Sequence, residues 1–120
     1  MWLALDPVDQ DNGCLRYCAG THRDGLRPHS RTQVLGFSQG ISDYDEADAA
    51  KEKPVFLEPG DLAVHHGDLI HRADPNRTTD RQRRAFAMVY YAGTAERNVE
   101  AHQAYMQQVT QQHDGMGLES

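Results

Sequence analysis

The chain has 120 residues, of which 38% are hydrophobic and 25% are charged, and its formal net charge at pH 7 is −6. This length allows one domain at most. The acidic balance and the lack of a continuous basic run argue against nucleic acid or an acidic membrane as a partner. No segment approaches the roughly 18 apolar residues of a membrane span. The start of the chain lacks a signal peptide pattern, so we expect a cytoplasmic location.

The N-terminal part of the chain contains two candidate strands. Residues 2–5 form an apolar run, and the Asn12-Gly13 pair closes a turn-rich stretch, since both residues tolerate positive φ. Residues 14–18 are predicted to run back beside the first strand. They hold both cysteines, which are too few for a disulfide framework or a structural zinc site. A domain rarely begins by burying its second residue without a partner strand, which favours a fragment or pairing with another copy.

The middle of the chain is less regular. Residues 19–31 lack periodicity and indicate a loop, residues 32–37 are predicted as a strand, and residues 41–53 indicate a mobile excursion with at most one helical turn. Short strands are then expected at residues 55–57, 62–66 and 69–71.

The C-terminal third carries the strongest periodic signals. Residues 83–91 alternate between two faces, which indicates a strand. Residues 94–112 indicate a surface helix that docks on the sheet, with Thr94 as its N-cap. The fold class expected is therefore all-β, mainly β with a C-terminal helix. A complete jelly roll needs about eight strands, and the five or six predicted here favour a partial one. Residues 1–93 would form this half of the roll, and residues 94–120 the helix and tail.

His71 is a candidate metal ligand. It is predicted to lie at the end of a strand with its side chain inward, and a neutral imidazole suits iron(II). A hydrogen-bonded core histidine is the alternative. The triplet His66-Gly67-Asp68 could supply two further ligands, although a facial triad normally draws its ligands from separate strands. His65 and His66 point to opposite faces of a strand, so only one of them can join His71.

Arg83 is a candidate carboxylate-binding residue. It shares a strand face with Ala85 and Ala87, whose small side chains leave room for a small dicarboxylate. Arg84 lies on the opposite face, where it must reach solvent or an acid. The alternative is that both arginines are solvated charges at the start of a strand.

Two ordered groups of motifs resemble the phytanoyl-CoA dioxygenase family. The first comprises Trp2-Leu3-Ala4-Leu5-Asp6, Asn12-Gly13-Cys14-Leu15 and Gly20-Thr21-His22. The second comprises Gly60-Asp61, His71, Pro75-Asn76 and Arg83-Arg84-Ala85. The resemblance covers residues 2 to about 92. It implies a double-stranded β-helix that binds Fe(II) and 2-oxoglutarate, and that couples oxidative decarboxylation of 2-oxoglutarate to hydroxylation of a small organic substrate.

The resemblance also implies roles for individual residues. His71 matches an iron-ligand histidine of the family. Arg83 matches the arginine that binds the far carboxylate of 2-oxoglutarate, but the spacing is one residue longer, which leaves Arg84, and then Arg81, as rivals. Trp2 falls near the cosubstrate site.

Three further positions in the motifs carry expectations. Asn12 and Asn76 are expected to brace turns. Ala73 stands where many members have a serine that helps to hold 2-oxoglutarate.

The resemblance also implies a His-x-Asp pair upstream of the strand that corresponds to residues 2–5. No such pair precedes these residues in this sequence. The chain is therefore expected to be the C-terminal part of such a dioxygenase, inactive in isolation, because one imidazole does not hold Fe(II) with useful affinity. No residue of this chain is assigned a catalytic role.

Two other hypotheses stay open. The chain could be a non-catalytic small β-domain that binds a metabolite or a partner, in one version as a homodimer. It could also be a self-contained metal-binding protein that uses His65 or His66 together with Asp68 and His71.

Overall fold

The computed structural model describes residues 1–33 and 39–115 of the chain, apart from the side chain of residue 113. It divides into two compact units. One unit comprises Met1–Ser30 and Gly40–Tyr90, and the other comprises Arg31–Gln39 and Tyr91–Ser120. The candidate site residues all lie in the first unit, which is described first.

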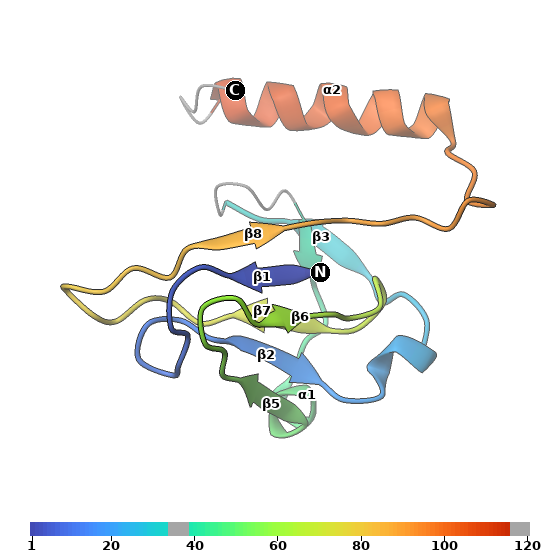
Figure 1. Ribbon diagram of the computed structural model, residues 1–120. Helices are drawn as coiled ribbons and strands as arrows, with labels where there is room; N and C mark the ends of the chain where they lie inside the picture. The colour runs from blue at the N-terminus through green and yellow to red at the C-terminus, as the bar shows by residue number, and fades with distance from the viewer. Residues whose placement is uncertain (34–38, 116–120) are drawn as a thin grey trace. The chain divides into compact units, whose positions relative to one another are not determined.

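One antiparallel sheet of the first unit is built around the N-terminal strand. Strand β1 (Trp2–Ala4) lies between β6 (Leu62–Ala63) and β8 (Ala85–Ala87) (Figure 1). Trp2 is opposite Ala63 and Ala87, whereas the next residue pairs with Leu62 and Phe86. Cross-strand partners share a face of a sheet, so small alanines flank the Trp2 indole and the other face carries larger apolar side chains.

The second antiparallel sheet holds the other half of the predicted site. Strand β2 (Leu15–Cys18) lies between β5 (Glu52–Val55) and β7 (His71–Ala73) (Figure 1). Tyr17 is opposite His71, which places both side chains on the same face.

The prediction that residues 14–18 pair with the first strand is wrong. The segment between β1 and β2 does not close a tight hairpin. Val8 instead forms an isolated bridge with Leu57 in the course of this connection, so the chain passes into the other sheet before it becomes extended again.

The remaining short elements partly match the prediction. They are the 3₁₀ helix η1 (Thr21–Arg23), strands β3 (His29–Arg31) and β4 (Gln39–Ile41), which pair with each other, and helix α1 (Glu46–Ala50). Strand β3 lies in a predicted loop. Residues 32 and 33 of the predicted strand 32–37 are not extended in a sheet, and the others lie outside the described residues. Helix α1 agrees with the expected single turn, because a reciprocal Asp45–Asp48 capping box satisfies its first backbone N–H groups.

Four predicted strands are displaced or shortened. The predicted strand 55–57 lies earlier in the chain, as β5 (Glu52–Val55). The run 83–91 is extended in a sheet only at Ala85–Ala87, and the run 62–66 only at Leu62–Ala63. His71 opens β7 and does not end a strand. In each case pairing with a short central strand sets the length of the edge strand, and periodicity alone does not reveal this limit.

The C-terminal helix α2 (Val99–Gly115) lies in the second unit. It begins later than predicted. The side-chain oxygen of Asn98, and not Thr94, caps it by accepting a hydrogen bond from the Ala101 amide at 2.9 Å. The expected docking of this helix on the sheet stays a prediction.

The buried apolar centre of the first unit is small. Ala4, Val8 and Cys14 are buried together, with Trp2 and Leu57 packed against them. Antiparallel strands with a C-terminal helix confirm the mainly β class, while the jelly-roll connectivity stays a prediction. Nothing in the part of the chain that the structure describes forms a helix of the length and apolarity that crossing a membrane requires.

Both cysteines are free thiols inside the fold. Cys14 and Cys18 are fully or almost fully buried, and this burial raises the pKa of each thiol. Reactive cysteines are exposed and have a lowered pKa, so these two serve packing.

A charged network lies on the face of the second sheet that points away from Tyr17 and His71. The buried Asp74 accepts from Arg16 Nε at 2.7 Å and also from Arg72, while Arg72 forms a second, bidentate pair with Glu52. Burial acts to raise the pKa of Asp74, but the hydrogen bonds from both arginines outweigh it, and the pKa lies below its usual value. Every charged group of this network thus has an opposite partner.

Candidate functional site

The segment that carries Arg83 is fixed from both sides before β8 begins. The side-chain amide of Asn12 donates to the carbonyl oxygen of Gln82 at 3.2 Å. The backbone amide of Leu5 donates to the carbonyl oxygen of Arg84 at 3.0 Å. Asn12 is fully buried and also donates to the Pro7 carbonyl at 2.7 Å. The bracing role expected of Asn12 is therefore present, and it locates the backbone of Arg83.

The Arg83 guanidinium packs between an aromatic ring and a turn. Its central carbon lies 5.5 Å from the centroid of the Trp2 ring, within the range of a cation–π interaction. Its Nε is the one buried side-chain nitrogen or oxygen atom without a hydrogen-bond partner among the residues that the structure describes. Leaving such a donor unsatisfied costs roughly 1–3 kcal/mol. Arg83 is therefore a positive group without an anionic partner among the described residues.

The two rival arginines already have acidic partners. Arg84 forms a bidentate pair with Asp6 at 3.0 and 2.8 Å, and its hydrogen bond lowers the pKa of Asp6 to about 2. Arg81 lies 2.9 Å from a carboxylate oxygen of Asp9. Both are thus engaged in holding the strands and turns in place. Their pairing leaves Arg83 as the arginine of this group with no acidic partner in the described part of the chain.

His71 lies in an aromatic cluster on the face of the second sheet. Its ring centroid is 4.4 Å from that of His65 and 6.5 Å from that of Tyr17. Its Nδ1 contacts the carbonyl oxygen of Leu69 at 2.7 Å. This contact requires a proton on Nδ1, so the neutral ring presents an unprotonated Nε2, the form in which imidazole binds metals. His71 is exposed.

His65 is held beside His71 by a second hydrogen bond. Its Nδ1 lies 2.7 Å from the Tyr17 hydroxyl. Partial burial, the neighbouring His71 and the chain's amino terminus together lower the pKa of His65. A neutral His65 therefore packs against His71 at neutral pH.

The alternative triad of His66, Asp68 and His71 is not assembled. His66 and Asp68 lie 3.9 Å apart, but the His66 ring faces His22, with a centroid distance of 5.9 Å, while His71 packs with His65. Within the described residues, no group of three or more histidine, cysteine, aspartate or glutamate side chains is placed to hold a metal ion. The geometry therefore does not support a self-contained metal site.

Gly13 is a residue of the site that sequence reasoning did not single out. A Cβ atom at this position would lie 2.6 Å from the Asp74 carbonyl oxygen and 3.3 Å from Arg83 Nε, and the residue has φ +99°. The Asn12-Gly13 pair indicated a turn, but the signal did not reveal which later segment packs on that turn.

Two other positions of the motif pattern are also described. The side chain of Asn76 donates to the Arg81 carbonyl oxygen at 2.7 Å and accepts from the Thr78 amide at 2.9 Å, as expected for a residue that braces a turn. Ala73 lies in β7, two residues after His71 and on the same face.

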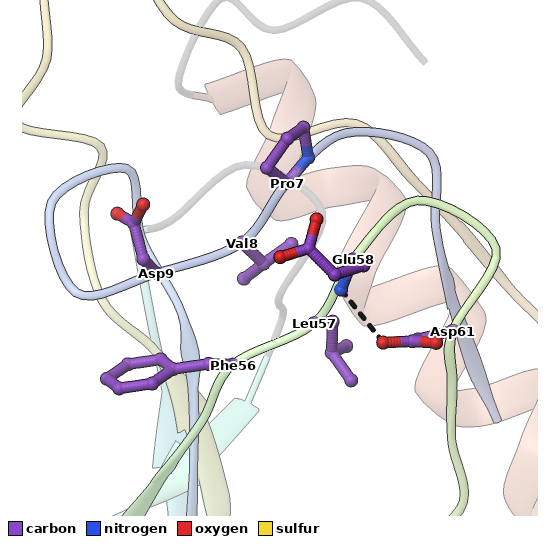
Figure 2. A pocket seen from close by; sticks show the side chains of 7 residues that line it. All are labelled: Pro7, Val8, Asp9, Phe56, Leu57, Glu58 and Asp61. Atoms are coloured by element: carbon purple, nitrogen blue, oxygen red, sulfur yellow. Dashed lines mark hydrogen bonds between the residues drawn. The ribbon is translucent and has the colours of Figure 1, made fainter.

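A shallow hollow of about 200 Å³ lies elsewhere in the first unit. It is lined by Pro7, Val8, Asp9, Phe56, Leu57, Glu58 and Asp61, as Figure 2 shows. Asp61 accepts a hydrogen bond from the Glu58 amide at 2.9 Å, and Asp9 pairs with Arg81. No predicted site residue lines this hollow, and two of its three acids are used within the fold.

Comparison with known proteins gives one family. The model of the family described as Phytanoyl-CoA dioxygenase (PhyH) matches residues 1–85. The bovine peroxisomal phytanoyl-CoA dioxygenase is 36% identical over 81 residues, which cover 64% of this chain and 23% of that protein. A probable phytanoyl-CoA dioxygenase of Caenorhabditis elegans is 37% identical over 81 residues, covering 64% of this chain and 25% of that protein.

More distant relatives match a slightly longer stretch. The zebrafish phytanoyl-CoA dioxygenase domain-containing protein 1 is 29% identical over 92 residues, covering 72% of this chain and 30% of that protein. The chain thus spans about a quarter of the length of the first curated relatives that it matches. No solved structure matches it significantly. The match of the family model over most of the sequence decides the assignment: the chain belongs to the phytanoyl-CoA dioxygenase family.

Proposed function

We propose that this chain supplies the carboxylate-binding arginine and one metal-binding histidine of a non-haem Fe(II)- and 2-oxoglutarate-dependent dioxygenase that hydroxylates a small organic substrate. The observation that carries the proposal is the Arg83 guanidinium, which lies against Trp2 and has no acidic partner in the described part of the chain. Family membership supplies the dioxygenase class.

Arg83 fits the far carboxylate of 2-oxoglutarate. A guanidinium binds a carboxylate through two parallel N–H donors and stays charged when it is partly buried. Arg83 would hold the cosubstrate from the segment just before β8, whose small Ala85 and Ala87 side chains leave room on the Trp2 face of the sheet. Trp2, predicted near the cosubstrate, contacts Arg83 directly.

His71 fits an iron ligand because its Nδ1 is occupied by the Leu69 carbonyl, which directs the free lone pair to Nε2. Ligands in addition to His71 would have to come from outside the described residues, since these do not assemble a group of three. We therefore expect the 120-residue chain by itself to lack turnover. When bound, Fe(II) with 2-oxoglutarate supplies the oxidative chemistry, while this chain's residues bind and orient.

An anaerobic titration of the 120-residue chain with Fe(II), with and without 2-oxoglutarate, tests the proposal, with His71→Ala as the matched variant. We expect at most weak Fe(II) binding that His71→Ala removes, because a single imidazole gives little affinity. Tight binding that survives in His71→Ala would contradict the assignment of His71. A chain extended upstream by a His-x-Asp segment should gain activity; an inactive extended chain would refute the proposal.

A second candidate function has one observation in its favour. Leu3, Leu62 and Phe86 share the outer face of the first sheet, and Leu62 and Phe86 are 46% and 58% exposed. Exposed apolar rows mark association surfaces, which suits a non-catalytic β-domain that forms a homodimer or binds a partner. Light scattering measures whether the chain is a monomer or a dimer in solution. A monomer at high concentration would exclude the homodimer.

A further inference from the structure

The neighbourhood of Arg83 contains two residues that hold its side chain without using its hydrogen-bonding capacity. The backbone on either side of Arg83 is already fixed, through the carbonyl oxygens of Gln82 and Arg84. Backbone placement alone does not orient an arginine, whose side chain has several rotatable bonds. Trp2 lies against the guanidinium, and a Cβ atom built at Gly13 would meet its Nε.

Trp2 attracts the guanidinium through the face of its ring. An aromatic ring stabilises a cation while leaving its N–H groups free, whereas a carboxylate would both neutralise the charge and occupy those groups. The neighbouring Arg84 differs in this respect, because two nitrogens of its guanidinium donate to the Asp6 carboxylate. Arg83 keeps both its charge and its donors.

Gly13 allows the turn to approach Nε from another direction. An ideal Cβ at residue 13 would meet Arg83 Nε at 3.3 Å and the Asp74 carbonyl oxygen at 2.6 Å. Any side chain here forces the turn or the backbone at residue 74 to shift, and it also displaces the Arg83 side chain from its place against the turn. The left-handed φ of +99° adds backbone strain to such a substitution.

We propose that Trp2 and Gly13 are positioning residues for Arg83: the indole holds its guanidinium, the bare turn at residue 13 encloses its Nε, and together they present its remaining N–H groups to a carboxylate. The nature of the ligand rests on the proposed function. The positioning itself does not, and it can be tested without any ligand.

The test compares Gly13→Ala with Gly25→Ala in the 120-residue chain. Gly25 also has a left-handed φ, +76°, but a Cβ there would meet nothing within 4 Å. Both variants therefore carry the backbone strain, and Gly13→Ala adds close contacts with the Asp74 carbonyl oxygen, the Asn76 amide nitrogen and Arg83 Nε. The readout is the Nε–H signal of Arg83 in ¹H–¹⁵N NMR spectra, assigned by its disappearance in Arg83→Lys.

In the unmodified chain we expect this signal to be displaced by the Trp2 ring and to exchange slowly with solvent. Gly13→Ala should shift it and speed its exchange by about tenfold, because the enclosed Nε opens to water. Gly25→Ala should leave it unchanged. A folded Gly13→Ala protein with an unaltered Arg83 signal would overturn the proposal for Gly13.

If Gly13→Ala does not fold, Trp2→Leu decides the question by the same exchange measurement. Faster exchange at Arg83 Nε supports the positioning role of Trp2, and unchanged exchange overturns it. A titration with 2-oxoglutarate then adds the ligand: Gly13→Ala should bind about tenfold more weakly than Gly25→Ala. Altered Arg83 signals without any binding of 2-oxoglutarate to the unmodified chain would support positioning and refute the proposed function.

Discussion

The arginines of the charged network on the second sheet and Arg83 differ in the partners of their guanidinium groups. In the network, Arg16 and Arg72 are neutralised by Asp74 and Glu52, and each carboxylate is held by hydrogen bonds. Arg83 contacts an aromatic ring and a glycine turn and has an unsatisfied, buried Nε. The first arrangement stabilises the pairing of three strands. The second leaves the remaining N–H groups of a guanidinium available to bind a carboxylate.

Breaking the network should have the largest effect on stability. Asp74→Asn leaves two arginines without their shared carboxylate inside the fold, so we expect the free energy of unfolding to fall by about 2–3 kcal/mol, below the full value for a buried pair because Arg72 is half exposed. Urea denaturation measures it. Asp80→Asn is the control, since Asp80 is exposed and forms no ion pair within the described residues; equal losses in both variants would contradict the structural role of Asp74.

Acid should weaken the charged network and also the Arg27–Asp48 pair, while the Arg83 guanidinium stays charged. The pKa values of Asp74 and Glu52 are lowered in the folded chain, as is that of Asp48, which Arg27 holds at about 2. Unfolded carboxyl groups titrate near pH ~4. These groups therefore stabilise the fold fully above that pH and lose this contribution as pH falls from about 4 towards 2.

The measurement is the urea midpoint at a series of pH values. Asp74→Asn should flatten the dependence between pH ~4 and ~2, because one depressed carboxyl group is gone. An equally steep dependence in the variant would show that other groups control acid unfolding.

Removing Arg83 should change stability least. Arg83→Met preserves much of the apolar packing on Trp2 and removes the unsatisfied Nε, so the lost cation–π attraction and the relieved burial roughly offset, and we expect a change below about 1 kcal/mol. Arg72→Met is the matched comparison, since it strips Glu52 of its bidentate partner. A loss in Arg83→Met as large as that in Arg72→Met would break the contrast between the two regions.

The sequence predicted the class of the fold more successfully than its pairing. Alternation around residue 85 and the apolar run at Trp2 correctly indicated strands, since both patterns reflect one buried face. That β2 pairs with β5 and β7, and not with β1, depends on contacts such as Val8 with Leu57, which are distant in sequence. The predicted strand lengths were wrong for the same reason.

For the candidate site, the sequence supplied the residue types and the structure supplied their partners. Arg83, Arg84 and Arg81 could not be ranked by spacing alone. Asp6 and Asp9 separate them, because they engage Arg84 and Arg81 respectively. Gly13 was missed because a close approach between a turn and a side chain far along the sequence leaves no local pattern.

Calorimetric titration of 2-oxoglutarate into the 120-residue chain, its Arg83→Met variant and its Arg84→Met variant tests most directly whether Arg83 is the binding group that the fold leaves free. We expect Arg83→Met to weaken binding by about tenfold or more, since the bidentate charged partner of the carboxylate is lost. Arg84→Met should leave the affinity unchanged. Loss of binding in Arg84→Met with retention in Arg83→Met would refute the assignment of Arg83, because the arginine paired with Asp6 would then be the one that binds the cosubstrate.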